Sequence, residues 1–243
     1  MREIEFLTYS LIAHRGYHNI KNGIPENSML AFKEAIKNDL IIELDVRILK
    51  DGKVVVFHDE SLKRMTGIDK KIEEINSSEL EEIHLLETNQ RIPLLEEVLD
   101  LINGQVSVII ELKSENKDRK LEKETIRILK NYRGKYAIKS FNPFSIRYFK
   151  KNFPSAIRGQ LASNLKNKKM NIIKKVFLSR MLFNIFTKPD FISYNFKDLP
   201  NNRIKKLRKK MIILGWTVRN EEDLEYAKKY CDNCICENIN LDK

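Results

Sequence analysis

Short apolar runs alternate with amphipathic stretches along almost the whole chain. Nine runs have the length and composition of buried β-strands, and they are Leu11–Ala13, Leu40–Val46, Val54–Phe57, Val106–Leu112, Tyr136–Lys139, Ile157–Leu161, Phe191–Tyr194, Ile212–Val218 and Asn233–Cys236. Eight stretches between them have helical patterns, and they are Ser28–Lys37, Ser77–Leu85, Pro93–Ile102, Leu121–Asn131, Pro143–Asn152, Ile172–Phe186, Asn202–Lys209 and Glu221–Tyr230. The last stretch follows Asn220, a good helix cap, and has acidic side chains in its first turn.

The alternation of strands and helices indicates βαβ units around a parallel sheet. About eight such units in a chain of this length is the size of a (β/α)8 barrel, the TIM-barrel fold. A doubly wound open sheet is the alternative, but no G-x-G-x-x-G or P-loop pattern follows any run. Because no linker, repeat or low-complexity stretch divides the chain, we expect an α/β protein with one TIM-barrel domain over residues 1–243.

One connection departs from this alternation. The pair Asp51-Gly52 separates two β-rich runs, which predicts a β-hairpin near residues 43–58 rather than a helical crossover. Nine strands are one more than the barrel needs. Either the return arm of this hairpin or a terminal strand is therefore expected to lie outside the barrel.

Composition is that of an ordinary globular chain, with 42% hydrophobic and 33% charged residues. No apolar stretch is long enough for a transmembrane helix, and the first residues do not have the pattern of a secretory signal. Three cysteines, Cys231, Cys234 and Cys236, lie close together near the end of the sequence. Their number and clustering do not suit a disulfide framework, and a metal site would lack a fourth ligand nearby, so we expect buried strand cysteines and a cytoplasmic location.

Acidic side chains interrupt two of the apolar β runs. Glu43 and Asp45 are two residues apart and so share one face of a strand, and Glu111 lies in a second run. Carboxylates are costly to bury unless a cation neutralises them, and carboxylate oxygens are the preferred ligands of hard divalent cations. A metal site is one interpretation. Structural ion pairs with Arg15, Arg47 or Lys113 are the other.

Basic and imidazole side chains follow the same strands. Arg15 and Lys113 suit a phosphate group, and His14 and His58 suit general acid–base catalysis near neutral pH. Each histidine alone could instead be structural, and Asp59 could orient His58 or cap the next segment. Because a barrel gathers the carboxyl ends of its strands at one mouth, the set together points to metal-assisted cleavage of a phosphodiester. Two later strand ends add Ser140-Phe141 and Trp216, and Trp216 is a further candidate for substrate contact.

The order of several motifs is similar to that of the glycerophosphodiester phosphodiesterase family. The matching segments are "AHRG", "PENS", "AFKEAI", "IELDVRILKDGKVVVFHDESLKRMTG", "IPLLEEVL", "IIELK", "SFNP" and "GWTVRNEEDL". The resemblance implies a TIM barrel, a divalent metal (Ca²⁺ or Mg²⁺) and hydrolysis of glycerophosphodiesters to sn-glycerol 3-phosphate and an alcohol.

The resemblance also implies roles for single residues. His14 and His58 would be the catalytic pair, Arg15 would contact phosphate, and Lys113 would bind substrate. The metal ligands would be Glu43, Asp45 and Glu111, with Glu26 and Asn27 nearby in the P-E-N element. The nucleophile, water or the glycerol hydroxyl of the substrate, and the division of acid and base roles between the histidines stay open. Cys236-Glu237 replaces the usual Thr-Asp pair, which leaves the polar rim near the end of the chain undefined. His18 is interpreted as a loop residue and His84 as a surface residue.

The net charge of +11 is concentrated in one part of the chain. Fourteen Lys and Arg residues but only two acids lie between Asn164 and Lys210. Within it, residues 164–188 mix lysines with large apolar side chains, which suits an outer barrel helix, a lid, or peripheral contact with an anionic membrane. The membrane interpretation would favour a lysophospholipase D-like or other phospholipid-cleaving activity. A nucleic-acid-binding protein explains the charge but not the acids and histidines, so no nucleic acid is expected. An inactive binding protein on the same barrel is a further alternative, which the intact set of candidate residues disfavours.

Overall fold

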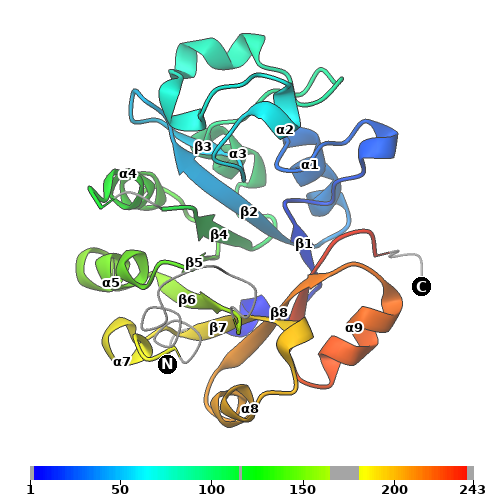
Figure 1. Ribbon diagram of the computed structural model, residues 1–243, viewed down its shortest axis with the longest axis vertical. Helices are drawn as coiled ribbons and strands as arrows, with labels where there is room; N and C mark the ends of the chain where they lie inside the picture. The colour runs from blue at the N-terminus through cyan, green and yellow to red at the C-terminus, as the bar shows by residue number, and fades with distance from the viewer. Residues whose placement is uncertain (1–2, 115–116, 165–180, 240–243) are drawn as a thin grey trace.

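Eight parallel strands form a closed ring in the computed structural model, which describes residues 3–114, 117–164 and 181–239. The strands of the ring are β1 (Ile12–His14), β2 (Ile41–Ile48), β4 (Val108–Leu112), β5 (Tyr136–Ser140), β6 (Ile157–Ala162), β7 (Phe191–Asn195), β8 (Ile212–Val218) and β9 (Asn233–Cys236). Each pairs with the next, and β1 pairs with both β2 and β9, which closes the ring. The predicted TIM barrel is confirmed (Figure 1).

The ninth strand lies outside the ring. β3 (Val54–Val56) runs antiparallel to the far end of β2, with Val46 opposite Val56 and Ile48 opposite Val54. The hairpin predicted at Asp51-Gly52 is therefore present, and its return arm is the extra strand. Gly52 has a φ of 85°, the left-handed conformation that this turn requires.

The helices lie around the outside of the ring, as Figure 1 shows. They are α1 (Met29–Lys37), α2 (Lys63–Thr66), α3 (Leu95–Ile102), α4 (Lys120–Leu129), α5 (Pro143–Asn152), α7 (Asn184–Thr187), α8 (Asn202–Arg208) and α9 (Glu221–Lys228). Short 3-10 helices are η1 (Glu5–Leu7), η2 (Ile20–Asn22), η3 (Ile72–Glu74), η4 (Ser77–Glu82) and η5 (Phe196–Asp198). The Asn220 side chain accepts a hydrogen bond from the Asp223 backbone N–H, so the expected cap of α9 is present.

Two helix predictions have different outcomes. The stretch predicted as a helix over Ser77–Leu85 contains the 3-10 helix η4 instead, because Leu80, Ile83 and Leu85 face a small core of their own. That core is built by the segment between β3 and α3 together with Leu49 and Val55 of the β2–β3 hairpin, beside which the segment is stacked (Figure 1). The helix predicted over Ile172–Phe186 lies largely outside the described residues.

The barrel interior is apolar at its bottom, where the ring strands begin, and polar at the carboxyl end of the strands. At the bottom, one residue from each of the eight ring strands joins Phe6 and Leu7 of the N-terminal segment in a single apolar cluster. Side chains alternate along a strand, so Ile41 at the bottom of β2 lies on the same face as Glu43 and Asp45 above it. The bottom is therefore a packed plug, and the polar side chains are left for the carboxyl end.

Two further predictions concern the cysteines and membrane-spanning helices. The three cysteines are buried and free, and two of them lie in β9, as expected. Within the described part of the chain, no helix is long and apolar enough to cross a bilayer.

Candidate active site

Three carboxylates meet at the carboxyl end of the barrel. Glu43 and Asp45 come from β2 and Glu111 comes from β4, where strand register places Asp45 opposite Glu111. All three are buried, with 0%, 1% and 5% of their surface exposed. One oxygen of each lies within 4.8 Å of the others. The sequence prediction that these acids converge is therefore confirmed.

Three cations surround the carboxylates. Lys113 Nζ lies 2.5 Å from Glu111 Oε1 and 3.1 Å from Asp45 Oδ1. Arg15 Nε lies 3.3 Å from Asp45 Oδ2, and its backbone N–H donates to Glu43 Oε2 at 3.1 Å. The structural ion pairs considered from the sequence thus exist for Arg15 and Lys113, in addition to any ligand role of the acids.

The third cation, Lys139, was not predicted. It lies on β5 opposite Glu111, with its Nζ 2.9 Å from Glu43 Oε1 and 3.2 Å from Glu111 Oε2. It is 2% exposed. The signal was available in the sequence, because a lysine at the end of an apolar β run is as anomalous as an acid there.

These charges fix the ionisation of the cluster. Burial alone would raise the pKa of Asp45, but Lys113 and Arg15 lower it far below its usual range. The pKa of Glu111 is lowered in the same way, against burial, by Lys113 and Lys139. Burial would lower the pKa of Lys113, yet Asp45 and Glu111 raise it well above its usual value, which keeps the ammonium charged. Asp45 and Glu111 are therefore carboxylates, and Lys113 and Lys139 are ammonium groups, at neutral pH.

His14 ends β1 and is held by a carboxylate from the other end of the chain. Its Nδ1 lies 2.9 Å from Glu237 Oε2, directly after β9. Glu237 also contacts Arg219, and His18 Nε2 lies 3.5 Å from the same oxygen. The Cys236-Glu237 pair thus completes the rim that the sequence left undefined, and His18 faces the site although it lies in a loop.

His58 has a similar arrangement. Its Nδ1 lies 2.6 Å from Asp59 Oδ1, and Asp59 Oδ2 accepts from Arg64 Nε at 2.5 Å. Arg64 also forms an ion pair with Glu26, and Glu26 Oε1 lies 2.6 Å from Arg15 Nη1. Burial lowers the pKa of His58, and the neighbouring cations add to this while Asp45 opposes it. The orienting role considered for Asp59 is therefore consistent with its geometry.

Loop backbone brings these groups close together. Gly16 has a φ of 80°, and a Cβ there would lie 2.9 Å from the Cβ of Ala31 in α1. Asn27, in the P-E-N element, donates from Nδ2 to Asp45 Oδ2 at 3.1 Å. Only glycine combines the left-handed conformation with this close contact, so the loop after β1 packs directly on α1.

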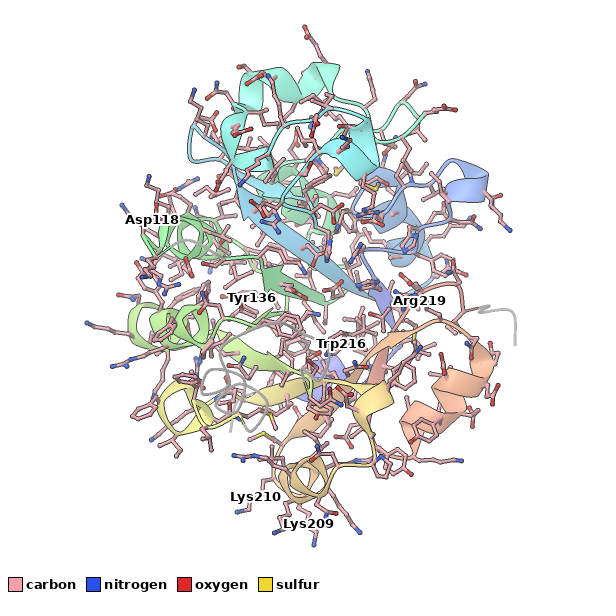
Figure 2. The ribbon with its side chains drawn as sticks, in the orientation of Figure 1. Asp118, Tyr136, Lys209, Lys210, Trp216 and Arg219 are labelled. Atoms are coloured by element: carbon pink, nitrogen blue, oxygen red, sulfur yellow. The ribbon has the colours of Figure 1, made fainter. Side chains whose placement is uncertain are left out.

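A cavity of about 330 Å³ opens at this end of the barrel. Its polar lining includes His14, Arg15, His58, Glu111, Lys113 and Lys139, and its apolar lining is Phe141, Leu161, Phe196 and Trp216. Phe141 and Trp216 pack edge to face with ring centroids 5.6 Å apart. Figure 2 shows Trp216 near the centre of the ring and Arg219 close to the end of β8. Of the residues predicted as catalytic, phosphate-binding or metal-ligating, all but Glu43 and Asp45 line this cavity.

The donor set suits a hard divalent cation. Three carboxylates from two neighbouring strands supply oxygen ligands only. Glu43 Oε1 is buried, and the Lys139 ammonium lies 2.9 Å from it. A buried carboxylate oxygen in this state has a lone pair available for a metal. The residues present therefore fit a divalent metal ion.

Comparison with known proteins gives one consistent family. The model of the Glycerophosphoryl diester phosphodiesterase family matches residues 14–238. A glycerophosphodiester phosphodiesterase of Bacillus altitudinis is 39% identical over 113 residues, 44% of this chain and 45% of that protein. One from Caldanaerobacter subterraneus is 37% identical over 158 residues, 59% of this chain and 63% of that protein. These matches thus span about half to under two thirds of the relatives' own length.

A solved structure agrees over a larger share of the fold. A phosphodiesterase of Oleispira antarctica, in complex with the product sn-glycerol-3-phosphate, superposes with a TM-score of 0.79 at 20% identity. The match covers 95% of this chain and 93% of that one. At this identity the likeness supports the barrel fold itself.

Proposed function

This chain belongs to the glycerophosphoryl diester phosphodiesterase family, and we propose that it hydrolyses glycerophosphodiesters to sn-glycerol 3-phosphate and an alcohol. The observation that carries the proposal is the meeting of a buried carboxylate triad with two carboxylate-held histidines at one cavity. The sn-glycerol-3-phosphate bound to the Oleispira relative supports this choice of product.

The carboxylate triad is the proposed metal site. Glu43, Asp45 and Glu111 would hold a divalent ion, Ca²⁺ or Mg²⁺, since both prefer oxygen ligands. When bound there, the metal supplies positive charge that offsets the negative charge of the phosphodiester. Arg15 and Lys113 line the same cavity, where they bind and orient the phosphate oxygens.

The two histidines are proposed to move the protons. Each Nδ1 donates its proton to an ionised carboxylate, Glu237 or Asp59, which leaves Nε2 of each ring for proton transfer. Because the pKa of His58 is lowered, His58 is neutral at neutral pH and accepts the proton of the attacking oxygen. His14 is then the acid that protonates the departing alkoxide.

The attacking oxygen belongs either to water or to the glycerol hydroxyl of the substrate. Attack by the substrate hydroxyl would benefit from proximity and would give a cyclic phosphate before the final product. Phosphorus NMR during turnover separates the two routes, since only the second gives a transient cyclic glycerophosphate signal.

The primary test measures release of sn-glycerol 3-phosphate from a panel of glycerophosphodiesters. Turnover should stop with a chelator, return with Ca²⁺ or Mg²⁺, and fall by about 10²-fold or more in His14→Ala. His84→Ala is the matched control, because His84 is exposed and lies outside the cavity. No turnover by a folded, metal-loaded wild-type protein would contradict the proposed function.

A second candidate substrate is a phospholipid at a membrane surface. Phe144, Ile185 and Phe186 are 50%, 73% and 57% exposed, and Arg147 lies among them at a small surface pocket. Exposed apolar side chains beside a cation are suited to an anionic bilayer. If this patch docks on lipid, Ile185→Ser/Phe186→Ser should reduce binding to vesicles with phosphatidylserine and reduce lysophospholipid cleavage. Ile20→Ser, at a similarly exposed position in η2, should change neither.

A further inference from the structure

Lys139 occupies the space between two of the proposed metal ligands. Its Nζ contacts one oxygen each of Glu43 and Glu111, which come from different strands. Its side chain is 3% exposed, whereas that of Lys113 is 16% exposed. No other ammonium contacts Glu43 among the ion pairs of the described residues. Lys139 is therefore the deeper of the two lysines and the one placed at Glu43.

The charges of the site balance without a metal. The carboxylates of Glu43, Asp45 and Glu111 are matched by the cations Arg15, Lys113 and Lys139. Isolated buried carboxylates would be strongly destabilising, so this balance stabilises the fold when no divalent ion is bound. A divalent ion at the same carboxylate oxygens would add two positive charges. It would lie beside an ammonium group that already neutralises these oxygens.

We propose that Lys139 is an internal counter-cation that competes with the divalent metal for Glu43 and Glu111. Metal binding displaces the Lys139 ammonium from these oxygens toward the cavity, whose wall Lys139 already joins. The inference rests on the proposed metal site, and it adds that the affinity of this site is set partly by the chain's own lysine.

Calorimetric titration of chelator-treated protein with Ca²⁺ tests the competition. Lys139→Met removes the competing charge, so the Kd for Ca²⁺ should fall by about tenfold or more, because a unit charge so close to the ligands opposes the metal. The metal-free variant should also melt at a lower temperature than wild type and gain more from Ca²⁺. Lys135→Met is the matched control, since Lys135 is exposed and precedes β5 at the opposite end of the barrel. Its Kd should equal that of wild type.

Asp45→Asn separates the inference from the metal site on which it rests. If Asp45→Asn abolishes Ca²⁺ binding while Lys139→Met leaves the Kd unchanged or raises it, the metal site stands. The proposed role of Lys139 is then overturned. Absence of Ca²⁺ and Mg²⁺ binding in both wild type and Lys139→Met would remove the metal site and the inference together.

A labelling measurement on the wild-type protein tests whether Ca²⁺ displaces the Lys139 amine, even if the Lys139 variants do not fold. Reductive methylation followed by peptide mass spectrometry reports how accessible each lysine amine is. Labelling of Lys139 should rise when Ca²⁺ is added, because the displaced amine reaches the cavity, while labelling of Lys135 should stay constant. Equal labelling of Lys139 with and without bound Ca²⁺ would overturn the proposal.

Discussion

At the scale of single residues, the two histidines proposed as catalytic are held by contacts of very different sequence separation. His14 is held by Glu237, more than two hundred residues later, whereas His58 is held by its neighbour Asp59. Gly16 provides the close contact between the loop after β1 and α1. We therefore expect a substitution at Gly16 to affect mainly stability and a substitution beside His58 to affect mainly turnover.

Replacement of Gly16 should be costly for stability. Gly16→Ala combines a left-handed backbone with a Cβ 2.9 Å from the Ala31 side chain, so we expect the free energy of unfolding to fall by about 2–4 kcal/mol. Gly23→Ala is the control, because its φ is 71° but, chain neighbours apart, no described residue lies within 4 Å of the added Cβ. Urea unfolding of both variants measures the difference. Equal losses would mean that the contact with Ala31 contributes nothing.

Replacement of Asp59 should change the pH dependence of turnover. The hydrogen bond from His58 to Asp59 raises the pKa of His58, against the larger effect of burial. Asp59→Asn removes that contribution, so the pKa of His58 falls and the acidic limb of kcat/KM moves to lower pH. The rate at the optimum should also fall by about 10²-fold or more, since the ring loses its orientation. Profiles of wild type, Asp59→Asn and the control Glu60→Gln test this; movement of the limb to higher pH would contradict it.

At the scale of elements, one helix cap stabilises the loop that carries the P-E-N element. The Ser28 side chain accepts from the Ala31 backbone N–H at 3.1 Å and donates to the Pro25 carbonyl at 2.7 Å. The cap of α1 is therefore continuous with Asn27, which binds Asp45. The Asn220 cap of α9, by contrast, bonds the backbone and the side chain of Asp223, which lies outside the cavity.

Loss of the α1 cap should affect both stability and turnover. Ser28→Ala should lower the free energy of unfolding by about 1–2 kcal/mol, and it should raise KM or lower kcat because Asn27 loses its support. Asn220→Ala should cost a similar amount of stability and leave the kinetics unchanged. Thermal unfolding and steady-state kinetics on both variants distinguish them. Unchanged kinetics in Ser28→Ala would show that the cap serves the helix alone.

At the scale of the whole molecule, the barrel has one sealed end and one open end. Leu7 is fully buried beneath the ring, beside one residue from each strand. The charged layer above it lies at the end where the cavity opens. Stability and chemistry are thus placed at opposite ends of the same strands, as is usual for this fold.

This separation predicts a variant that loses stability without losing catalysis. Leu7→Ala leaves a cavity in the bottom plug, so the free energy of unfolding should fall by about 2–5 kcal/mol while kcat at moderate temperature stays unchanged. Ile20→Ala, at a half-exposed position, should have little effect on either. Chemical denaturation and kinetics measure both quantities. A parallel loss of kcat in Leu7→Ala would mean that the two ends are coupled.

The sequence by itself determined the strand positions, the hairpin and most of the candidate site. Apolar runs are local patterns, and the acids and histidines are visible as polar interruptions at the ends of those runs. The same local reasoning was wrong for Ser77–Leu85, where the apolar side chains pack into a separate small core and no α-helix is needed.

Only the tertiary structure decided which cations meet which acids. The ring places Lys139 of β5 beside Glu111 of β4 through strand register, and closure of β9 on β1 brings Glu237 to His14. Closure also decided that β3 is the strand left outside, because β1 pairs with β2 and β9 and leaves no place for another. Register and closure depend on all eight strands at once, and no local pattern of residues specifies them.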